Sequence, residues 1–382
     1  MQGEPDLDRV VFTGAAPGRR EVREILVRES LEHSISVRPH VAVRTPLCDL
    51  LGIDVPILSV GFGASATPEL AAAVSNAGGL GVLGLGIPPD AARGRIARAR
   101  ELTQRPFGGN IIIADLAMVE ATEKDREETR QAVGLLFAER VPVVILFWGD
   151  PAPFVAPAHR AGVRLLVQVG STEQAIAARD AGVDAVILQG SEAGGHVLAK
   201  RSIWETLPIT VRALGTTPII ASGGIADGRA IARAIKEGAQ GVSLGTRFVA
   251  CEEAWIHPHY KRRIVEATAG DTELSDDLFD GGWPGAPHRF LKNRTYREWV
   301  AAGRPPSGKR PGAGDEIGTM RLPWANRVAH RYDAGMLVPT FDGDPEDYVM
   351  WAGTSVDQVR DLKPAEAIIR DLVRETEDAL AA

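Results

Sequence analysis

Alternation between short apolar segments and helical segments constrains the fold of this 382-residue chain more than any other feature. Eight runs rich in β-branched residues are separated by alanine-rich stretches with helical periodicity. Continuous apolar runs are typical of parallel strands that are buried on both faces. The expected strands cover residues 55–60, 80–85, 109–113, 141–148, 164–169, 184–189, 218–222 and 241–245.

The helices expected between these strands cover residues 67–76, 89–102, 117–139, 151–161, 172–181, 202–214 and 227–237. Several of them begin at a capping Thr, Ser or Asp and end at Ala-Gly, as helix boundaries commonly do. Eight βα units favour an α/β fold of the closed (β/α)8 TIM-barrel type. The alternative is an open doubly wound sheet, in which case the count of eight strands is too high by one.

The amino-acid composition of the chain changes after the eighth expected strand. Of the 21 Phe, Trp and Tyr residues, 12 lie beyond residue 250, among many prolines and glycines. This pattern predicts a small, mostly helical or irregular insertion subdomain over residues 251–350 that covers the barrel of residues 45–250. An amphipathic pattern over 356–380 predicts that residues 351–382 return to the barrel as its eighth helix. Residues 1–44, with a weak helical pattern near 22–31, are expected to form an arm.

Composition excludes several classes of protein. The chain has 43 Lys and Arg against 50 Asp and Glu, a net charge of −7, which argues against nucleic acid as a partner. Its longest strongly apolar run, residues 141–148, is too short to cross a membrane, and its first residues do not resemble a signal peptide. Cys48 and Cys251 have no metal or redox spacing. A cytoplasmic protein is therefore expected, and a homodimer is compatible with the sequence.

Two glycine-containing loops follow the seventh and eighth expected strands. The first contains Ser222, Gly223 and Gly224, and the second contains Gly245 and Thr246. Glycine lets backbone N–H groups approach a ligand closely, and these two loops form the recurring phosphate site of TIM barrels. The sequence therefore predicts phosphate binding here, although the glycines could serve only to make tight turns.

A histidine follows the sixth expected strand. His196 comes directly after the flexible pair Gly194 and Gly195, which can bring the backbone close to a flat ligand. An imidazole accepts protons near neutral pH, so His196 is the candidate catalytic base. His257 and His259 lack a recognisable set of further ligands, and no metal site is predicted.

Three amide side chains are expected at the mouth of the barrel: Asn110, Gln168 and Gln189. The alternating nitrogen and carbonyl groups of a flavin ring edge suit such neutral partners, but an amide could equally bind a neighbouring loop. Residues 79–84 formally match a dinucleotide fingerprint. That motif must follow a strand and open a helix, whereas here it follows a helix, so this interpretation is rejected.

Taken together, these residues resemble the nitronate monooxygenase (2-nitropropane dioxygenase) family. The matching segments are residues 67–81, the Gly109-Asn110 pair, residues 189–196 and residues 222–247. A looser resemblance continues through residues 258–293 and the Trp351-Ala352-Gly353 segment.

The resemblance implies an FMN-dependent enzyme in which dioxygen oxidises nitronates or nitroalkanes to carbonyl compounds and nitrite. It places the phosphate at the two glycine loops and the flavin ring near Gly61, Phe62 and Gly63, together with the amides and Gly194. His196 matches the histidine that removes the proton α to the nitro group. Phe62 departs from the family, which often has Pro-Met after the first strand.

Three alternatives remain open from the sequence. The flavin-dependent enoyl-acyl-carrier-protein reductases, which use NADH or NADPH, share the Glu-Ala-Gly-Gly-His segment at residues 192–196. A barrel of the inosine-monophosphate-dehydrogenase type would need a nucleophilic cysteine in a loop after a strand, and none is evident. The third alternative is a flavin-binding barrel without catalytic activity.

Overall fold

Eight parallel strands form the centre of the structure, a computed structural model that describes residues 43–281, 283 and 285–382. They are β1 (Ile57–Ser59), β2 (Gly81–Gly84), β3 (Phe107–Ile112), β4 (Val143–Phe147), β5 (Arg164–Val169), β6 (Ala185–Gln189), β8 (Ile219–Ser222) and β9 (Gly241–Leu244). Each strand pairs in parallel with its neighbour, and β9 pairs with β1. A bridge between Leu58 and Leu80 joins β1 to the start of β2. The predicted TIM barrel is therefore confirmed.

Helices alternate with these strands, as the sequence predicts. They are α3 (Pro68–Asn76), α4 (Pro89–Leu102), α5 (Glu123–Ala138), α6 (Ala152–Ala161), α7 (Thr172–Ala181), α8 (Ile203–Leu214) and α9 (Gly228–Lys236). Thr67, Ser171 and Asp227 accept a hydrogen bond from a backbone N–H in the first turn of α3, α7 and α9. Because each cap fixes where its helix begins, these boundaries agree with the expected ones to within a residue.

Side chains fill the interior of the barrel. Leu58, Val82, Ile145, Leu166 and Ile187 from five strands share one buried cluster. The short helix α2 (Pro46–Leu51) adds apolar side chains to the same cluster and so covers one end of the barrel. The barrel is a packed core, and ligands can bind only at its mouth.

Two helix boundaries differ from the sequence predictions. Helix α5 begins at Glu123 and not at residue 117, because Thr122 and Asp125 form a capping box there. Helix α13 (Ala365–Ala381) begins after Pro364, nine residues later than predicted. Residues Thr354–Gln358 form a separate 3-10 helix, η5. Helix α13 contacts both α9 and α3, so it occupies the place of the eighth barrel helix.

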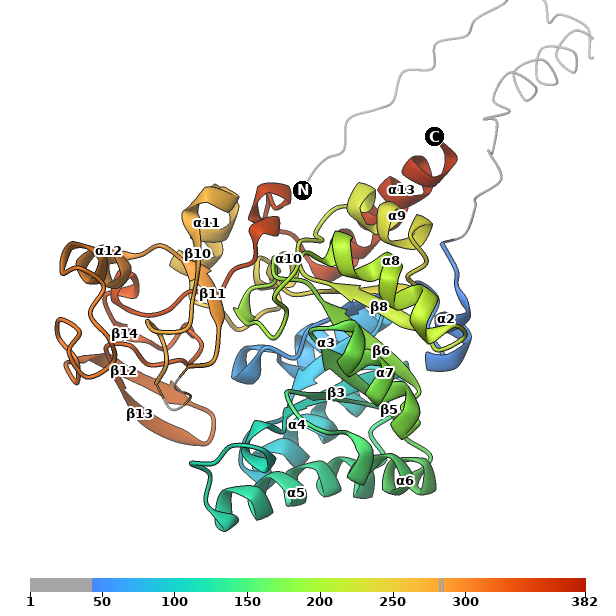
Figure 1. The fold of residues 1–382 in the computed structure, drawn as a ribbon, viewed down its shortest axis with the longest axis horizontal. Helices are drawn as coiled ribbons and strands as arrows, with labels where there is room; N and C mark the ends of the chain where they lie inside the picture. The colour runs from blue at the N-terminus through green and yellow to red at the C-terminus, as the bar shows by residue number, and fades with distance from the viewer. Residues whose placement is uncertain (1–42, 282, 284) are drawn as a thin grey trace, which may run out of the picture. The chain divides into compact units, whose positions relative to one another are not determined.

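Between β9 and α13 the chain builds the insertion beside the barrel (Figure 1). Its helices are α10 (Thr246–Val249), α11 (Pro258–Glu266) and α12 (Arg294–Ala301). Unlike the expected helical or irregular structure, it also contains two antiparallel sheets. One joins β10 (Thr272–Ser275) and β11 (His288–Leu291) to β7 (Gly195–His196), and the other joins β12 (Glu316–Leu322), β13 (Ala325–His330) and β14 (Asp342–Gly343).

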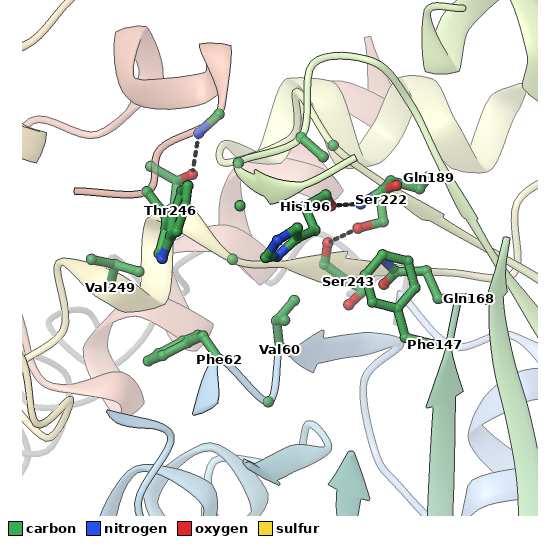
Figure 2. A pocket seen from close by; sticks show the side chains of 18 of the residues that line it. Val60, Phe62, Phe147, Gln168, Gln189, His196, Ser222, Ser243, Thr246 and Val249 are labelled. Atoms are coloured by element: carbon green, nitrogen blue, oxygen red, sulfur yellow. Dashed lines mark hydrogen bonds between the residues drawn. The ribbon is translucent and has the colours of Figure 1, made fainter. Parts of the chain in front are cut away.

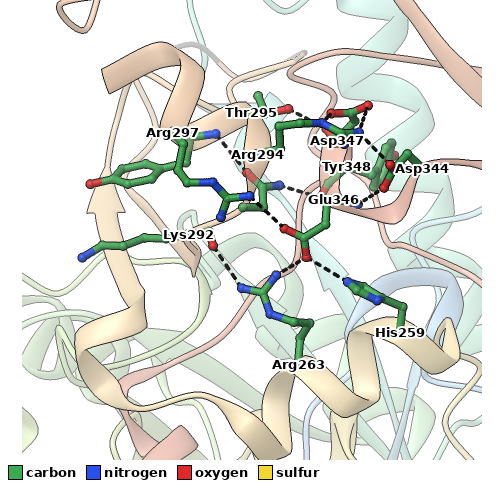
Figure 3. Close-up of polar contacts among 12 residues, drawn as sticks. His259, Arg263, Lys292, Arg294, Thr295, Arg297, Asp344, Glu346, Asp347 and Tyr348 are labelled. Carbon is green, nitrogen blue, oxygen red and sulfur yellow. Dashed lines mark hydrogen bonds and ion pairs between the residues drawn. The ribbon is translucent and has the colours of Figure 1, made fainter. Parts of the chain in front are cut away.

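A cluster of charged side chains ties the end of the insertion to its helices (Figure 3). The Glu346 carboxylate pairs with His259 at 2.8 Å, with Arg297 at 3.5 Å and with Arg263. Arg294 pairs with Asp347 at 2.6 Å. The segment after residue 343 is thus fixed to α11 and α12 just before it returns to the barrel mouth.

Within residues 43–281, 283 and 285–382, no helix has both the length and the apolar character needed to cross a membrane.

Candidate active site

A cavity opens at the carboxyl ends of the barrel strands, where active sites of this fold lie (Figure 2). Its empty volume is about 960 Å³, which includes space open to solvent. No Asp, Glu, Lys or Arg is among the described residues that line it. A ligand in this cavity must therefore be bound by neutral groups.

The sequence located most of this cavity. Every predicted site residue except Gly63 lines it: Gly61, Phe62, Asn110, Gln168, Gln189, Gly194, Gly195, His196, Ser222, Gly223, Gly224, Gly245 and Thr246. Gly63 is not among the residues that line the cavity. It has a φ of 57°, and its carbonyl oxygen lies 2.0 Å from the position that a Cβ at Gly84 would take. Gly63 shapes the loop that carries Phe62 and does not itself face the cavity.

Backbone and hydroxyl groups form one end of the cavity. Gly223 and Gly224 have φ values of 90° and 72°, a conformation that favours glycine. The Ser222 hydroxyl donates to the Ser243 carbonyl, so its proton is already used. Thr246 Oγ1 accepts a hydrogen bond from the Gly353 N–H at 3.1 Å and keeps its own proton for a ligand.

The returning segment, residues 351–358, completes this end of the cavity. Gly353 and Ser355 line it beside Thr246. The Gln358 side chain accepts a hydrogen bond from the Ala226 N–H at 2.6 Å and donates to the Gly224 carbonyl at 3.2 Å. It thus holds the loop after β8 in shape. Sequence reasoning missed Ser355, although the adjacent segment 351–353 belongs to the family resemblance.

The three predicted amides have different environments. Gln189 uses both ends of its amide internally, donating to the His196 carbonyl at 3.0 Å and accepting from the Leu198 N–H at 2.8 Å. Asn110 donates to the Ile145 carbonyl at 3.1 Å, which leaves its oxygen free. Among the described residues Gln168 has no hydrogen-bond partner for its side chain. Gln168 is thus the amide most available to a ligand.

His196 lies on strand β7, which pairs with β11 of the insertion so that His196 faces His288. Its Nε2 atom is buried and has no hydrogen-bond partner among the described residues. Burial, with a smaller effect from His288, lowers the pKa of His196 to about 4. The ring is therefore neutral at physiological pH and can accept a proton.

Aromatic rings surround this imidazole. The ring centroids of Trp283 and Trp351 lie 4.4 Å and 5.7 Å from that of His196, with interplanar angles of 33° and 40°. Trp148 lies edge-on at 6.2 Å and has a φ of 64°, which is unusual for a bulky residue. It follows β4, although the sequence predicts it as the last residue of that strand.

Glu192, the carboxylate nearest to His196 in the sequence, has a structural role. One of its oxygens accepts a hydrogen bond from the Ile203 N–H at 3.1 Å, and the other accepts from the Ser202 hydroxyl. It thus satisfies donors at the start of α8 and is not available as a second base. No group of three His, Cys, Asp or Glu side chains suited to a metal ion occurs in the part of the chain that the structure describes.

Comparison with known proteins agrees with this geometry. The family model described as "Nitronate monooxygenase" matches residues 44–375. The chain belongs to the nitronate monooxygenase family. A nitronate monooxygenase from Paraburkholderia phytofirmans is 32% identical over 87% of this chain and 95% of its own length. Members of the nitronate monooxygenase family are oxidoreductases, and this chain is an enzyme of that class.

Solved structures show the same architecture. FabK from Thermotoga maritima superposes with a TM-score of 0.69 at 32% identity, covering 89% of this chain and 98% of FabK. A nitroalkane oxidase from Streptomyces ansochromogenes superposes with a TM-score of 0.68 at 29% identity, covering 87% of this chain and 99% of the oxidase. The similarity to both proteins therefore extends beyond the barrel into the insertion.

Proposed function

We propose that this enzyme uses FMN and dioxygen to oxidise nitronates, and nitroalkanes after deprotonation, to carbonyl compounds and nitrite. The observation that carries the proposal is His196, a neutral and unpaired imidazole in an uncharged cavity beside two glycine loops. Membership of the nitronate monooxygenase family supports the same reaction.

The residues of the cavity fit a flavin mononucleotide. Its phosphate would bind to backbone N–H groups near Gly223, Gly224 and Gly245 and to the hydroxyls of Thr246 and Ser355. Gly61 lies in the cavity wall beside Asn110, and glycine is required there because a Cβ would lie 2.6 Å from the Cβ of Asn110 and 2.8 Å from the Leu83 carbonyl oxygen. Gln168 and Asn110 then offer amide groups to the ring edge. A flavin bound there would supply the electron sink for the nitronate and would be reoxidised by dioxygen.

His196 prepares the substrate for this oxidation. In a neutral nitroalkane the bond between the α-carbon and its hydrogen breaks, the electron pair remains as the delocalised nitronate, and the proton moves to the imidazole. Phe62, Phe147 and Trp351 line the same cavity and limit access of water to the reacting atoms.

The decisive experiment replaces His196 with Asn. The His196→Asn variant should retain bound flavin, and its kcat/KM should fall about 100-fold or more on neutral nitroalkanes, the usual size of a general-base contribution. Preformed nitronates need no proton removal, so kcat/KM for them should fall much less. An equal loss on both substrates would show that His196 is not the carbon base.

The uncharged and largely apolar walls also suit an enoyl thioester, reduced with NADH or NADPH. The two activities are separated by anaerobic mixing with each reductant while the flavin absorbance is followed. A nitronate should bleach the flavin within one turnover, whereas NADH and NADPH should not. Rapid bleaching by NADH or NADPH, without bleaching by a nitronate, would establish the reductase instead.

A further inference from the structure

His196 has no anionic partner. A catalytic histidine that removes a proton becomes an imidazolium, and this charge is commonly stabilised by a carboxylate hydrogen-bonded to the ring. Here the ring nitrogens have no hydrogen-bond partner among the described residues. Glu192, the adjacent acid, is bonded to the start of α8. Another group must stabilise the charge.

The titratable neighbours of His196 do not supply a negative charge. On β11, His288 accepts a hydrogen bond from the Phe279 N–H at Nε2 and contacts the Ala286 carbonyl through Nδ1 at 2.8 Å. These partners require a neutral ring with its proton on Nδ1, and burial lowers the pKa of His288. The next residue of β11, Arg289, donates to the Ser191 carbonyl and is itself a cation.

Among the described ring contacts of His196, two indoles are the nearest. The ring centroids of Trp283 and Trp351 both lie within 6 Å of that of His196, and their planes are inclined to it by 40° or less, so neither indole is edge-on to the imidazole. A cation within about 6 Å of an indole face is attracted by the ring quadrupole, most strongly where water is excluded. The Trp351 N–H donates to the Gly335 carbonyl at 2.9 Å, and Trp148 packs against Trp283 at 4.6 Å. Both indoles are therefore held in position.

We propose that Trp283 and Trp351 stabilise the imidazolium that His196 becomes when it takes the α-proton, in place of a carboxylate. This inference rests on the proposed function, in which His196 is the base. The two tryptophans act through His196 and are positioning residues. The interaction favours the charged ring and therefore opposes the desolvation that keeps the ring neutral.

The first test measures the pKa of His196 directly, by NMR titration of the holoenzyme with isotope-labelled histidine. Trp351→Leu keeps an apolar side chain but removes the π face, and should lower the pKa of His196. Trp351→Phe keeps a weaker π face and should lower it less. Trp283→Leu, at a half-buried position, provides a second variant in case Trp351→Leu does not fold. Trp204→Leu is the control, since Trp204 packs against Arg233 on the outer helices. It should leave the pKa unchanged.

The second test compares two substrates. The ratio of kcat/KM for a neutral nitroalkane to that for its preformed nitronate should fall about 5- to 30-fold in Trp351→Leu and Trp283→Leu, the strength of a desolvated cation–π contact. The inference would be overturned if the kcat/KM ratio fell without a lower pKa of His196. It would also be overturned if the pKa of His196 were unchanged or higher in both leucine variants. Failure of the proposed function is recognised separately, by an equal loss on both substrates in His196→Asn.

Discussion

Gln168 and Gln189 occupy the carboxyl ends of adjacent strands, yet only one of them is free. Gln189 joins the two sides of the loop that carries His196, because its amide bonds both the His196 carbonyl and the Leu198 N–H. The Gln168 amide has no partner among the described residues. The same residue type therefore builds the site at one strand end and is available to bind at the next.

This difference predicts opposite phenotypes for two alanine variants. Gln189→Ala leaves a donor and an acceptor unsatisfied and should lower the free energy of unfolding by about 2–4 kcal/mol. Gln168→Ala should change stability by less than about 0.5 kcal/mol and should weaken flavin binding. Urea denaturation and flavin titration measure the two quantities. Normal stability in Gln189→Ala would contradict the assigned role.

The low pKa of the His196 imidazole, whose Nε2 atom is buried, also predicts a pH dependence of stability. Its pKa is near 4 in the folded protein and about 6.5 when unfolded, so the unfolded chain binds more protons between these values. The contribution of His196 to the free energy of unfolding is fully present above pH 6.5. It falls by roughly 3 kcal/mol at most as the pH decreases towards 4.

Thermal unfolding of the flavin-free protein tests this directly. The melting temperature of the unmodified protein should fall more steeply between pH 7 and pH 4.5 than that of His196→Asn, which has no ring to protonate. Parallel curves for the two proteins would mean that His196 is not buried in its neutral form.

Among elements, the loop after β8 depends on a backbone conformation that glycine allows. Gly224 has a φ of 72°, and a Cβ there would lie 3.0 Å from the Cβ of Glu192. Gly224→Ala should therefore distort the loop and reduce the flavin content of the purified protein. Gly162 has a similar φ of 74° at the end of α6, and a Cβ there would have no other atom within 4 Å.

Gly162→Ala is thus the matched control for backbone strain. It should lower the free energy of unfolding by about 1–2 kcal/mol and leave the flavin content unchanged. Gly224→Ala should lower the free energy of unfolding by at least the same amount. Flavin absorbance relative to protein absorbance in both purified variants decides the question. If both variants bind flavin fully, the loop after β8 does not form the phosphate site.

The elements of the barrel could be predicted from sequence, whereas the insertion could not. Strands such as β4 and β6 are buried on both faces and appear as unbroken apolar runs. Strands β12 and β13 are largely exposed and have no such pattern. Strand β7 has two residues and exists because β11, about ninety residues later, pairs with it. Such long-range pairing leaves no local signal.

The candidate site shows the same division. His196 and the glycine loops follow strands and could be found by position, because TIM barrels bind ligands at these ends. Ser355 and Met336 reach the cavity from the insertion and the returning segment. Their contribution depends on a path of about one hundred residues between β9 and η5, which the sequence does not specify locally.

At the scale of the whole molecule, the barrel is completed by its last helix. Helix α13 packs between α9 and α3, and its residues Ile368, Ile369 and Leu372 are buried. Glu375 accepts a hydrogen bond from the Gly228 N–H at 3.0 Å, so α13 also satisfies a donor at the start of α9. The insertion therefore lies in the chain between the eighth strand and the helix that completes the barrel wall.

Close packing of these two helices predicts the effect of one added methyl group. A Cβ at Gly228 would lie 2.3 Å from the Cβ of Glu375 and 2.5 Å from the backbone nitrogen of Thr376, so Gly228→Ala must move α13 outward. Overpacking of this kind costs about 1–3 kcal/mol. Gly94→Ala is the matched control, since Gly94 lies within α4 and a Cβ there would have no other atom within 4 Å. Because alanine favours the helix more than glycine does, this substitution should raise the free energy of unfolding by about 0.5–1 kcal/mol. Chemical denaturation should thus show a lower free energy of unfolding for Gly228→Ala and a higher one for Gly94→Ala. If both substitutions stabilise the protein, α13 does not close the barrel through this contact.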